Sequence, residues 1–102
     1  MFKLQKTPTF TTTATLNVPT DEGQVEQTIG VRFKVMPKEA GELEADEFLR
    51  QAILRVDDVV DEDNEPLSFG PELLEQLLAT PFAVIGLIKA YWQALSGARS
   101  GN

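Results

Sequence analysis

Hydrophobic and polar residues alternate along two runs in the first third of the chain. In the first run, one face of an extended chain would carry Phe10, Thr12, Ala14, Leu16 and Val18. The second run alternates in the same way from Val25 to Val35. Between the runs, Pro19 and Gly23 indicate a turn, because proline fixes φ and glycine readily takes a positive φ. The pattern predicts an antiparallel β-hairpin within about residues 9–36.

The pattern changes to a helical period from about residue 40 to residue 96. The stretch 42–54 predicts a first helix, with acidic residues in its first turn, where the helix dipole favours them. One side of this helix would carry Leu43, Phe48, Ala52, Ile53 and Val56. The β-branched residues Val56, Val59 and Val60 are also compatible with a short extended segment before the acidic turn that follows.

Two prolines predict where the later helices begin. Pro71 at a first helical position opens a helix over about residues 72–79. Thr80 is the expected N-cap of the last helix, with Pro81 at its first position and Leu95 near its end. Ser96 and Gly97 would end this helix.

Together these elements predict an α+β fold in a single domain over residues 1–102. A hairpin would be followed by three to four α-helices, and a short flexible tail would occupy residues 97–102. A length of 102 residues is suited to one domain, and its 42% hydrophobic content is typical of a folded protein.

The last two helices carry more hydrophobic side chains than a hairpin and one acidic helix can readily cover. We therefore expect part of this surface to be shared between subunits or offered to a partner. We expect Trp92 to pack inside and Tyr91 to lie at the rim, so that Tyr91→Asp would spare the fold. The candidate partner-binding residues are Leu73, Leu77, Leu78, Phe82, Ile85, Ile88, Tyr91 and Trp92.

The net charge of −7 is concentrated in the middle of the chain. Between Lys38 and Glu65, eleven acidic residues face only three basic ones, Lys38, Arg50 and Arg55. Such a surface repels phosphate backbones, so we expect no nucleic-acid partner. It is either a solvated face that keeps the protein dispersed or a docking surface for a basic partner.

The composition disfavours catalysis and metal binding. The chain has no histidine and no cysteine, which excludes Ser-His-Asp and Cys-His mechanisms and zinc–thiolate sites. Asp61, Asp63, Glu65 and Glu72 match positions 1, 3, 5 and 12 of a calcium-binding EF-hand loop. However, Pro66 stands where that loop needs a glycine, so a solvated turn is the better interpretation. We expect no enzyme activity, no metal and no cofactor.

Membrane and export signals are not evident in the sequence. Residues 1–4 are followed by Lys, Thr and Pro within a few positions, without an apolar signal-peptide core. The longest apolar stretch, Pro81–Ile88, is far shorter than the ~20 residues that span a bilayer. We expect a soluble, cytoplasmic protein with no membrane partner.

The order of these segments resembles the tail assembly chaperones of long-tailed bacteriophages. The resemblance lies in Gly30–Glu39, Phe48–Leu54, Val59–Phe69 with its acidic turn, and Ala90–Ala94 near the end. An aromatic residue expected near the end of the first long helix is replaced by aliphatic residues. Asn64 stands where a glycine is expected in the acidic turn, although asparagine tolerates the left-handed conformation.

The resemblance implies a function for the whole chain. Such a chaperone coats the helical tape measure protein, keeps it soluble and helps to recruit tail tube subunits. It acts in the cytoplasm of the infected or lysogenic host and is not expected in the mature virion. The alternative is a small acidic inhibitor or adaptor that acts by protein–protein binding.

Overall fold

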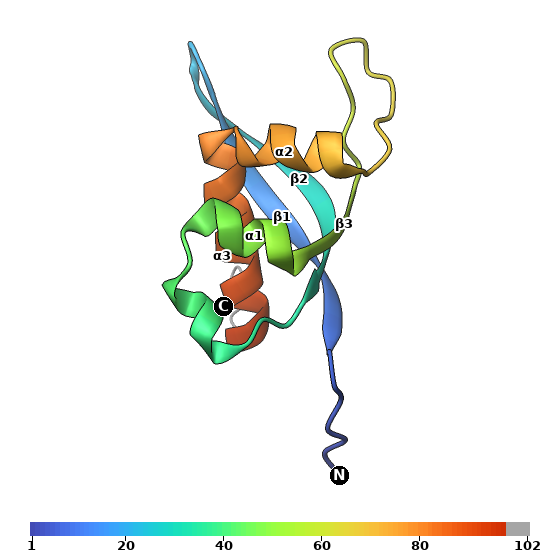
Figure 1. Ribbon diagram of the computed structural model, residues 1–102. Coiled ribbons are helices and arrows are strands. Elements are labelled where there is room, and N and C mark those ends of the chain that lie inside the picture. Colours follow the sequence, from blue (N-terminus) through green and yellow to red (C-terminus); the bar gives the residue numbers. More distant parts are fainter. Residues whose placement is uncertain (98–102) are drawn as a thin grey trace.

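The computed structural model describes residues 1–97 as an α+β fold (Figure 1). Three antiparallel strands form one sheet in the order β1-β2-β3, and three α-helices pack with it. The α+β class and the N-terminal hairpin are confirmed, whereas a fourth α-helix is not found among these residues. The expected tail lies outside the described residues from position 98 onwards. The elements are β1 (Thr9–Thr20), β2 (Gly23–Lys34), a 3-10 helix η1 (Lys38–Glu42), α1 (Ala45–Ala52), β3 (Ile53–Asp57), α2 (Pro71–Leu78) and α3 (Pro81–Ser96).

The hairpin forms as the alternation predicts, in a register that pairs Thr20 with Gly23 at the turn. Gly23 has φ 116°, which explains why glycine is needed there. The Thr20 hydroxyl also donates a hydrogen bond of 2.6 Å to the Gly23 carbonyl. On β1, Ala14 and Leu16 are buried, and the threonines between and beside them are exposed. One face of the hairpin is therefore ready to be covered.

The first helix is shorter than the sequence predicts, because its last part is a strand. The helix α1 ends at Ala52, and Ile53 is already extended with ψ 123°. Residues 53–57 then pair with β2, with Val56 opposite Val31. The prediction that Ile53 lies on a helix face is wrong, and Val56 belongs to a short extended segment, which was the alternative for this residue. Both residues are β-branched, and β2 offers them a free sheet edge and a buried position.

The helix α3 packs closely against β1. A Cβ atom built on Gly86 would lie 2.5 Å from the carbonyl oxygen of Thr15 and 2.7 Å from Cδ2 of Leu16. Only glycine lets the helix come this near to the strand. Because β1 is at the edge of the sheet, the helix also shields part of an edge that could otherwise pair with another chain.

Tyr91 is the centre of the aromatic core. Its side chain is 1% exposed, and four other rings lie with their centroids 4.9–5.7 Å from it: Phe10, Phe33, Phe48 and Trp92. Its hydroxyl accepts a buried hydrogen bond of 2.9 Å from the backbone N–H of Met36. Trp92, in contrast, is 49% exposed. The expectation that Trp92 is inside and Tyr91 at the rim is therefore wrong, because the tyrosine hydroxyl has a partner within the core.

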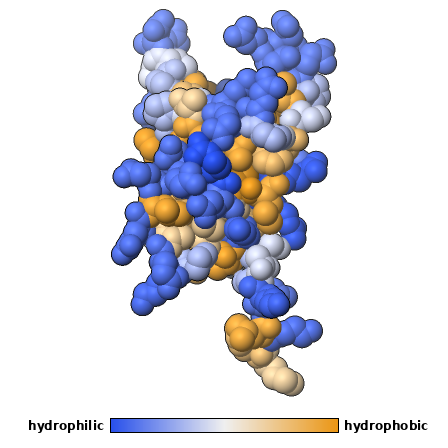
Figure 2. All heavy atoms as spheres, in the orientation of Figure 1, coloured by the Kyte–Doolittle hydropathy of each residue, from blue (hydrophilic) through white to orange (hydrophobic). Residues whose placement is uncertain are grey.

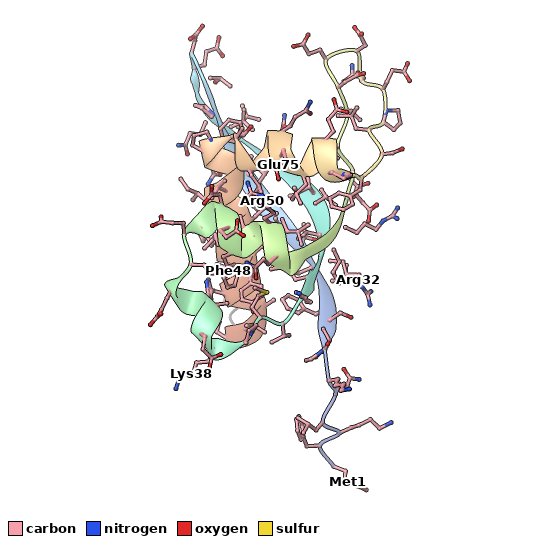
Figure 3. All side chains as sticks on the ribbon, viewed as in Figure 1. Met1, Arg32, Lys38, Phe48, Arg50 and Glu75 are labelled. Carbon is pink, nitrogen blue, oxygen red and sulfur yellow. The ribbon has the colours of Figure 1, made fainter. Side chains whose placement is uncertain are left out.

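An ion pair joins the two shorter helices. Figure 3 shows Arg50 of α1 directed toward Glu75 of α2, to which it donates hydrogen bonds of 2.7 and 2.9 Å. Arg50 also bonds Glu47 within its own helix at 2.6 Å. The bonds from Arg50 lower the pKa of Glu75 below its usual value, and the same bonds raise the pKa of the guanidinium. The pair fixes α2 against α1 on the outside of the fold.

Candidate interaction surface

An exposed hydrophobic stripe runs along the outer side of α3. Four residues at i, i+3, i+7 and i+10 positions share this side of the helix. Three of them are exposed, and Ile88 is half-buried. The inner side is made of small or fully buried residues such as Ala83, Leu87 and Ala90. We define the α3 stripe as Ile85, Ile88, Trp92 and Leu95, of which Ile85 is 67% exposed and Leu95 43% exposed.

Trp92 is held in place although half of it faces solvent. Its ring stacks on Phe48 of α1 with a centroid distance of 6.0 Å and an interplanar angle of 28°. It also meets the buried Tyr91 ring edge-on at 5.0 Å. A partly exposed aromatic side chain that is already ordered contributes to binding at a low cost in conformational entropy. Trp92 is therefore the best-placed anchor for a partner on this surface.

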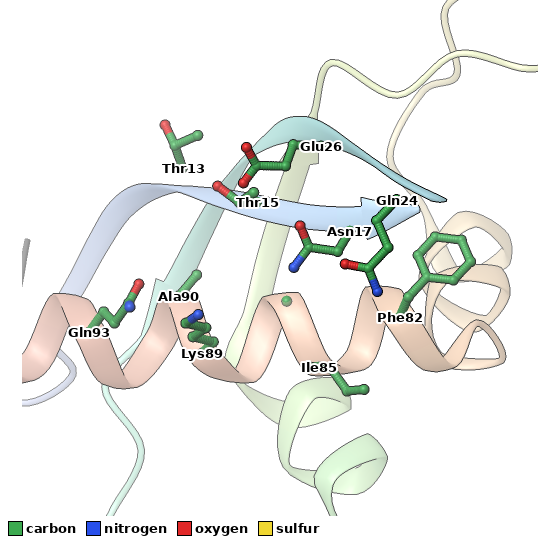
Figure 4. Close-up of a pocket in the computed structure, with 11 residues that line it drawn as sticks. Thr13, Thr15, Asn17, Gln24, Glu26, Phe82, Ile85, Lys89, Ala90 and Gln93 are labelled. Atoms are coloured by element: carbon green, nitrogen blue, oxygen red, sulfur yellow. The ribbon is translucent and has the colours of Figure 1, made fainter. Parts of the chain in front are cut away.

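A shallow groove of about 380 Å³ separates the α3 stripe from the outer face of the hairpin (Figure 4). The strand side is polar and includes Thr13, Thr15 and Glu26, whereas Phe82 and Ile85 line the helix side. Hydroxyl, carboxylate and hydrophobic groups in one groove suit an amphipathic peptide better than a small apolar ligand.

Local interactions close the end of α3 and connect α2 to α3. Gly97 closes α3 in the left-handed conformation, with φ 74°, as the sequence predicts. Thr80 lies at the N-cap position but makes no side-chain capping bond. Its hydroxyl instead donates to the carbonyl of Gln76 at 2.9 Å, which ties the end of α2 to the start of α3. Thr80 is therefore the N-cap residue that the sequence predicts, although its side chain makes no capping hydrogen bond.

The structure separates the eight candidate partner-binding residues into three groups. Leu73, Leu78 and Tyr91 are buried and cannot be reached by a partner in this conformation. Leu77, Phe82 and Ile88 are half-buried, while Ile85 and Trp92 are exposed. Leu95 lies on the hydrophobic side of the last helix, as the sequence indicates, but it is not among the eight candidate partner-binding residues. Its spacing from Ile85, Ile88 and Trp92 was the signal that could have identified it.

The acidic turn after β3 is ordered by its own side chain. One carboxylate oxygen of Asp61 accepts hydrogen bonds from the backbone N–H groups of Asp63, at 2.8 Å, and Glu65, at 3.0 Å. Asn64 has φ 62°, the left-handed conformation that asparagine tolerates. Among residues 1–97, no group of three acidic side chains is arranged to hold a metal ion.

Comparison with known proteins adds no relative, since no protein family, curated protein or solved structure matches this chain. Within the described part of the chain, no single helix is long and apolar enough to cross a membrane. The geometry by itself defines a small α+β protein with an exposed hydrophobic helix face.

Proposed function

We propose that this protein is a tail assembly chaperone of a long-tailed bacteriophage. In this proposal, the α3 stripe binds a hydrophobic helical segment of the tape measure protein and keeps it dispersed until tail tube subunits are recruited. The protein would act in the host cytoplasm before the virion is complete.

The observation that carries the proposal is the α3 stripe itself. Isolated exposed hydrophobic residues are normal, but a contiguous row of them along one helix is typical of an interaction site. A helical client would place its own hydrophobic residues at i, i+3, i+4 and i+7 against Trp92 and its neighbours. The groove beside Phe82 and Ile85 would then receive polar residues at the edge of the client helix.

The charge distribution supports the same function. Hydrophilic residues cover the hairpin turn and the loop after β3, which project from the same end of the molecule (Figure 2). Acidic residues on these projections would face water when the stripe is occupied. A net negative charge favours solubility and opposes non-specific aggregation of the complex. This property is what a chaperone for a long hydrophobic helix requires.

The test is binding of purified protein to tape measure segments. Trp92 is the only tryptophan, so its fluorescence emission should shift to shorter wavelength when a client helix covers it. Ile85→Ser combined with Leu95→Ser should weaken binding at least about tenfold, since anchor residues dominate such interfaces.

A matched control changes hydrophobic residues of similar exposure elsewhere. Val25→Ser combined with Leu54→Ser alters side chains that are 47% and 42% exposed and lie outside α3. This control should leave the affinity within about twofold of the wild type. If no tape measure segment binds, or if both double variants lose affinity equally, the chaperone proposal fails. The acidic inhibitor or adaptor would then be the better explanation.

A further inference from the structure

The first residues of the chain form an exposed arm that carries both hydrophobic and basic groups. The arm, Met1–Thr7, precedes Pro8, whose carbonyl accepts the last hydrogen bond of the hairpin from the backbone N–H of Val35 at 2.8 Å. Phe2 is 86% exposed and Leu4 is 85% exposed, while Lys3 and Lys6 stand between and beyond them. Figure 2 shows hydrophobic residues at the far end of this arm, separated from the body of the protein. Among the described residues 1–97, nothing covers these side chains.

A second hydrophobic feature lies beside the acidic turn. A groove of about 490 Å³ lies between the loop after β3 and α2, and its lining includes Val60, Leu67 and Leu77. Val60 is 50% exposed and Leu67 is 36% exposed. Asp61 and Glu62 also line this groove, and Asp63 and Glu65 follow them in the same turn. The site is thus hydrophobic at its floor and negative at its rim.

The groove is preformed in the folded chain. Val60 and Pro66 form an isolated bridge, and the N–H of Leu67 donates to the carbonyl of Val59 at 2.8 Å. Asp61 orders the turn between them through its two backbone hydrogen bonds. A partner that binds here therefore does not bear the full entropy cost of ordering the loop.

The arm and the groove are complementary in chemistry and lie at opposite ends of the molecule. In Figure 1 the N-terminus is at the bottom, and the loop after β3 is at the top. To reach the groove of its own chain, the arm would have to reverse direction directly at Pro8. The ring of Pro8 fixes φ, and its carbonyl is bound to Val35, which opposes such a reversal.

We infer that the arm of one copy binds in the groove of a second copy. Phe2 and Leu4, which are two residues apart, point to the same side of an extended segment and contact the hydrophobic floor. Lys3 and Lys6 lie near the carboxylates of the rim, where charge complementarity sets the orientation of the segment. The contact joins two different surfaces, so it is head-to-tail and repeats from copy to copy into a ring or a filament. This association does not depend on a tape measure client.

The experiment measures the mass of the full-length protein by sedimentation equilibrium over a range of concentrations. The mass of the wild type should rise with concentration. Phe2→Ser combined with Leu4→Ser should give the mass of a single chain, and so should Lys3→Glu combined with Lys6→Glu. For the lysine variant we expect the dissociation constant to rise at least about tenfold, because like charges then meet at the rim. Lys34→Glu combined with Lys38→Glu, which makes the same change in net charge outside the arm, should associate like the wild type.

Two mixing experiments separate this contact from other modes of association. Glu62→Lys combined with Asp63→Lys should also prevent assembly, and adding Lys3→Glu and Lys6→Glu to the same chain should restore it. A mixture of the Phe2/Leu4 serine variant, whose groove is intact, with the Glu62/Asp63 lysine variant, whose arm is intact, should stop at one-to-one dimers. A wild type that remains monomeric would overturn the inference, and so would arm variants that associate normally. Tape measure binding by the monomeric arm variants would leave the proposed function intact.

Discussion

The interior position of Tyr91 can be tested by removing a single oxygen atom. In Tyr91→Phe the aromatic ring remains among its neighbours, but the N–H of Met36 loses its hydrogen-bond partner in a buried site. An unsatisfied buried donor costs about 1–3 kcal/mol in the free energy of unfolding. For a domain of this size, a loss of 1 kcal/mol lowers Tm by roughly 4–8 °C. We therefore expect Tyr91→Phe to lower Tm by at least about 4 °C.

The assay is urea and thermal unfolding followed by far-ultraviolet circular dichroism, with Trp92→Phe as the matched control. Trp92 is half-exposed, and phenylalanine keeps a ring against Phe48, so this change should stay within about 0.5 kcal/mol. Tyr91→Asp would place a carboxylate among four aromatic rings and should unfold the protein rather than spare it. If Tyr91→Phe is neutral while Trp92→Phe costs more than about 1 kcal/mol, the two aromatic residues have been assigned to the wrong sides of α3.

Two further predictions concern packing and pH. Gly86→Ala should destabilise the fold by about 1–3 kcal/mol in urea unfolding, although alanine favours helices, because its Cβ would meet the Thr15 backbone. Ala94→Gly, at an exposed position of the same helix, provides the control. A Gly86→Ala variant that is more stable than the wild type would contradict the close contact. The Arg50–Glu75 pair contributes stability at neutral pH, above the pKa of an unfolded glutamate, and loses it as the pH falls through the lowered pKa of Glu75. Glu75→Gln should therefore reduce stability at pH 7 and make little difference in strong acid, a pattern that unfolding curves at several pH values would show, whereas an equal loss at every pH would exclude the ion pair as its cause.

The sequence alone determined the features that depend on near neighbours in the chain. The alternation predicted the hairpin, because a shift of the strand register by one residue would turn Ala14 and Leu16 to solvent. Pro71 and Pro81 marked the first residues of α2 and α3, because proline at these positions needs no hydrogen bond from its nitrogen. Gly97 marked the end of α3 through its positive φ.

Tertiary structure decided the features that depend on distant partners. Ile53 and Val56 became a strand because β2 presented an open edge to them, although their spacing also fitted a helix. The close approach of α3 to β1 at Gly86 turns the Gly86 side of the helix toward the sheet. Ile85, Trp92 and Leu95 point away from the sheet and therefore remain exposed. Tyr91, and not its neighbour Trp92, is buried because its hydroxyl accepts a hydrogen bond from the backbone N–H of Met36, 55 residues earlier in the chain. Local periodicity places two adjacent aromatic residues about 100° apart on a helix, but only the folded chain shows which of them meets a hydrogen-bond donor.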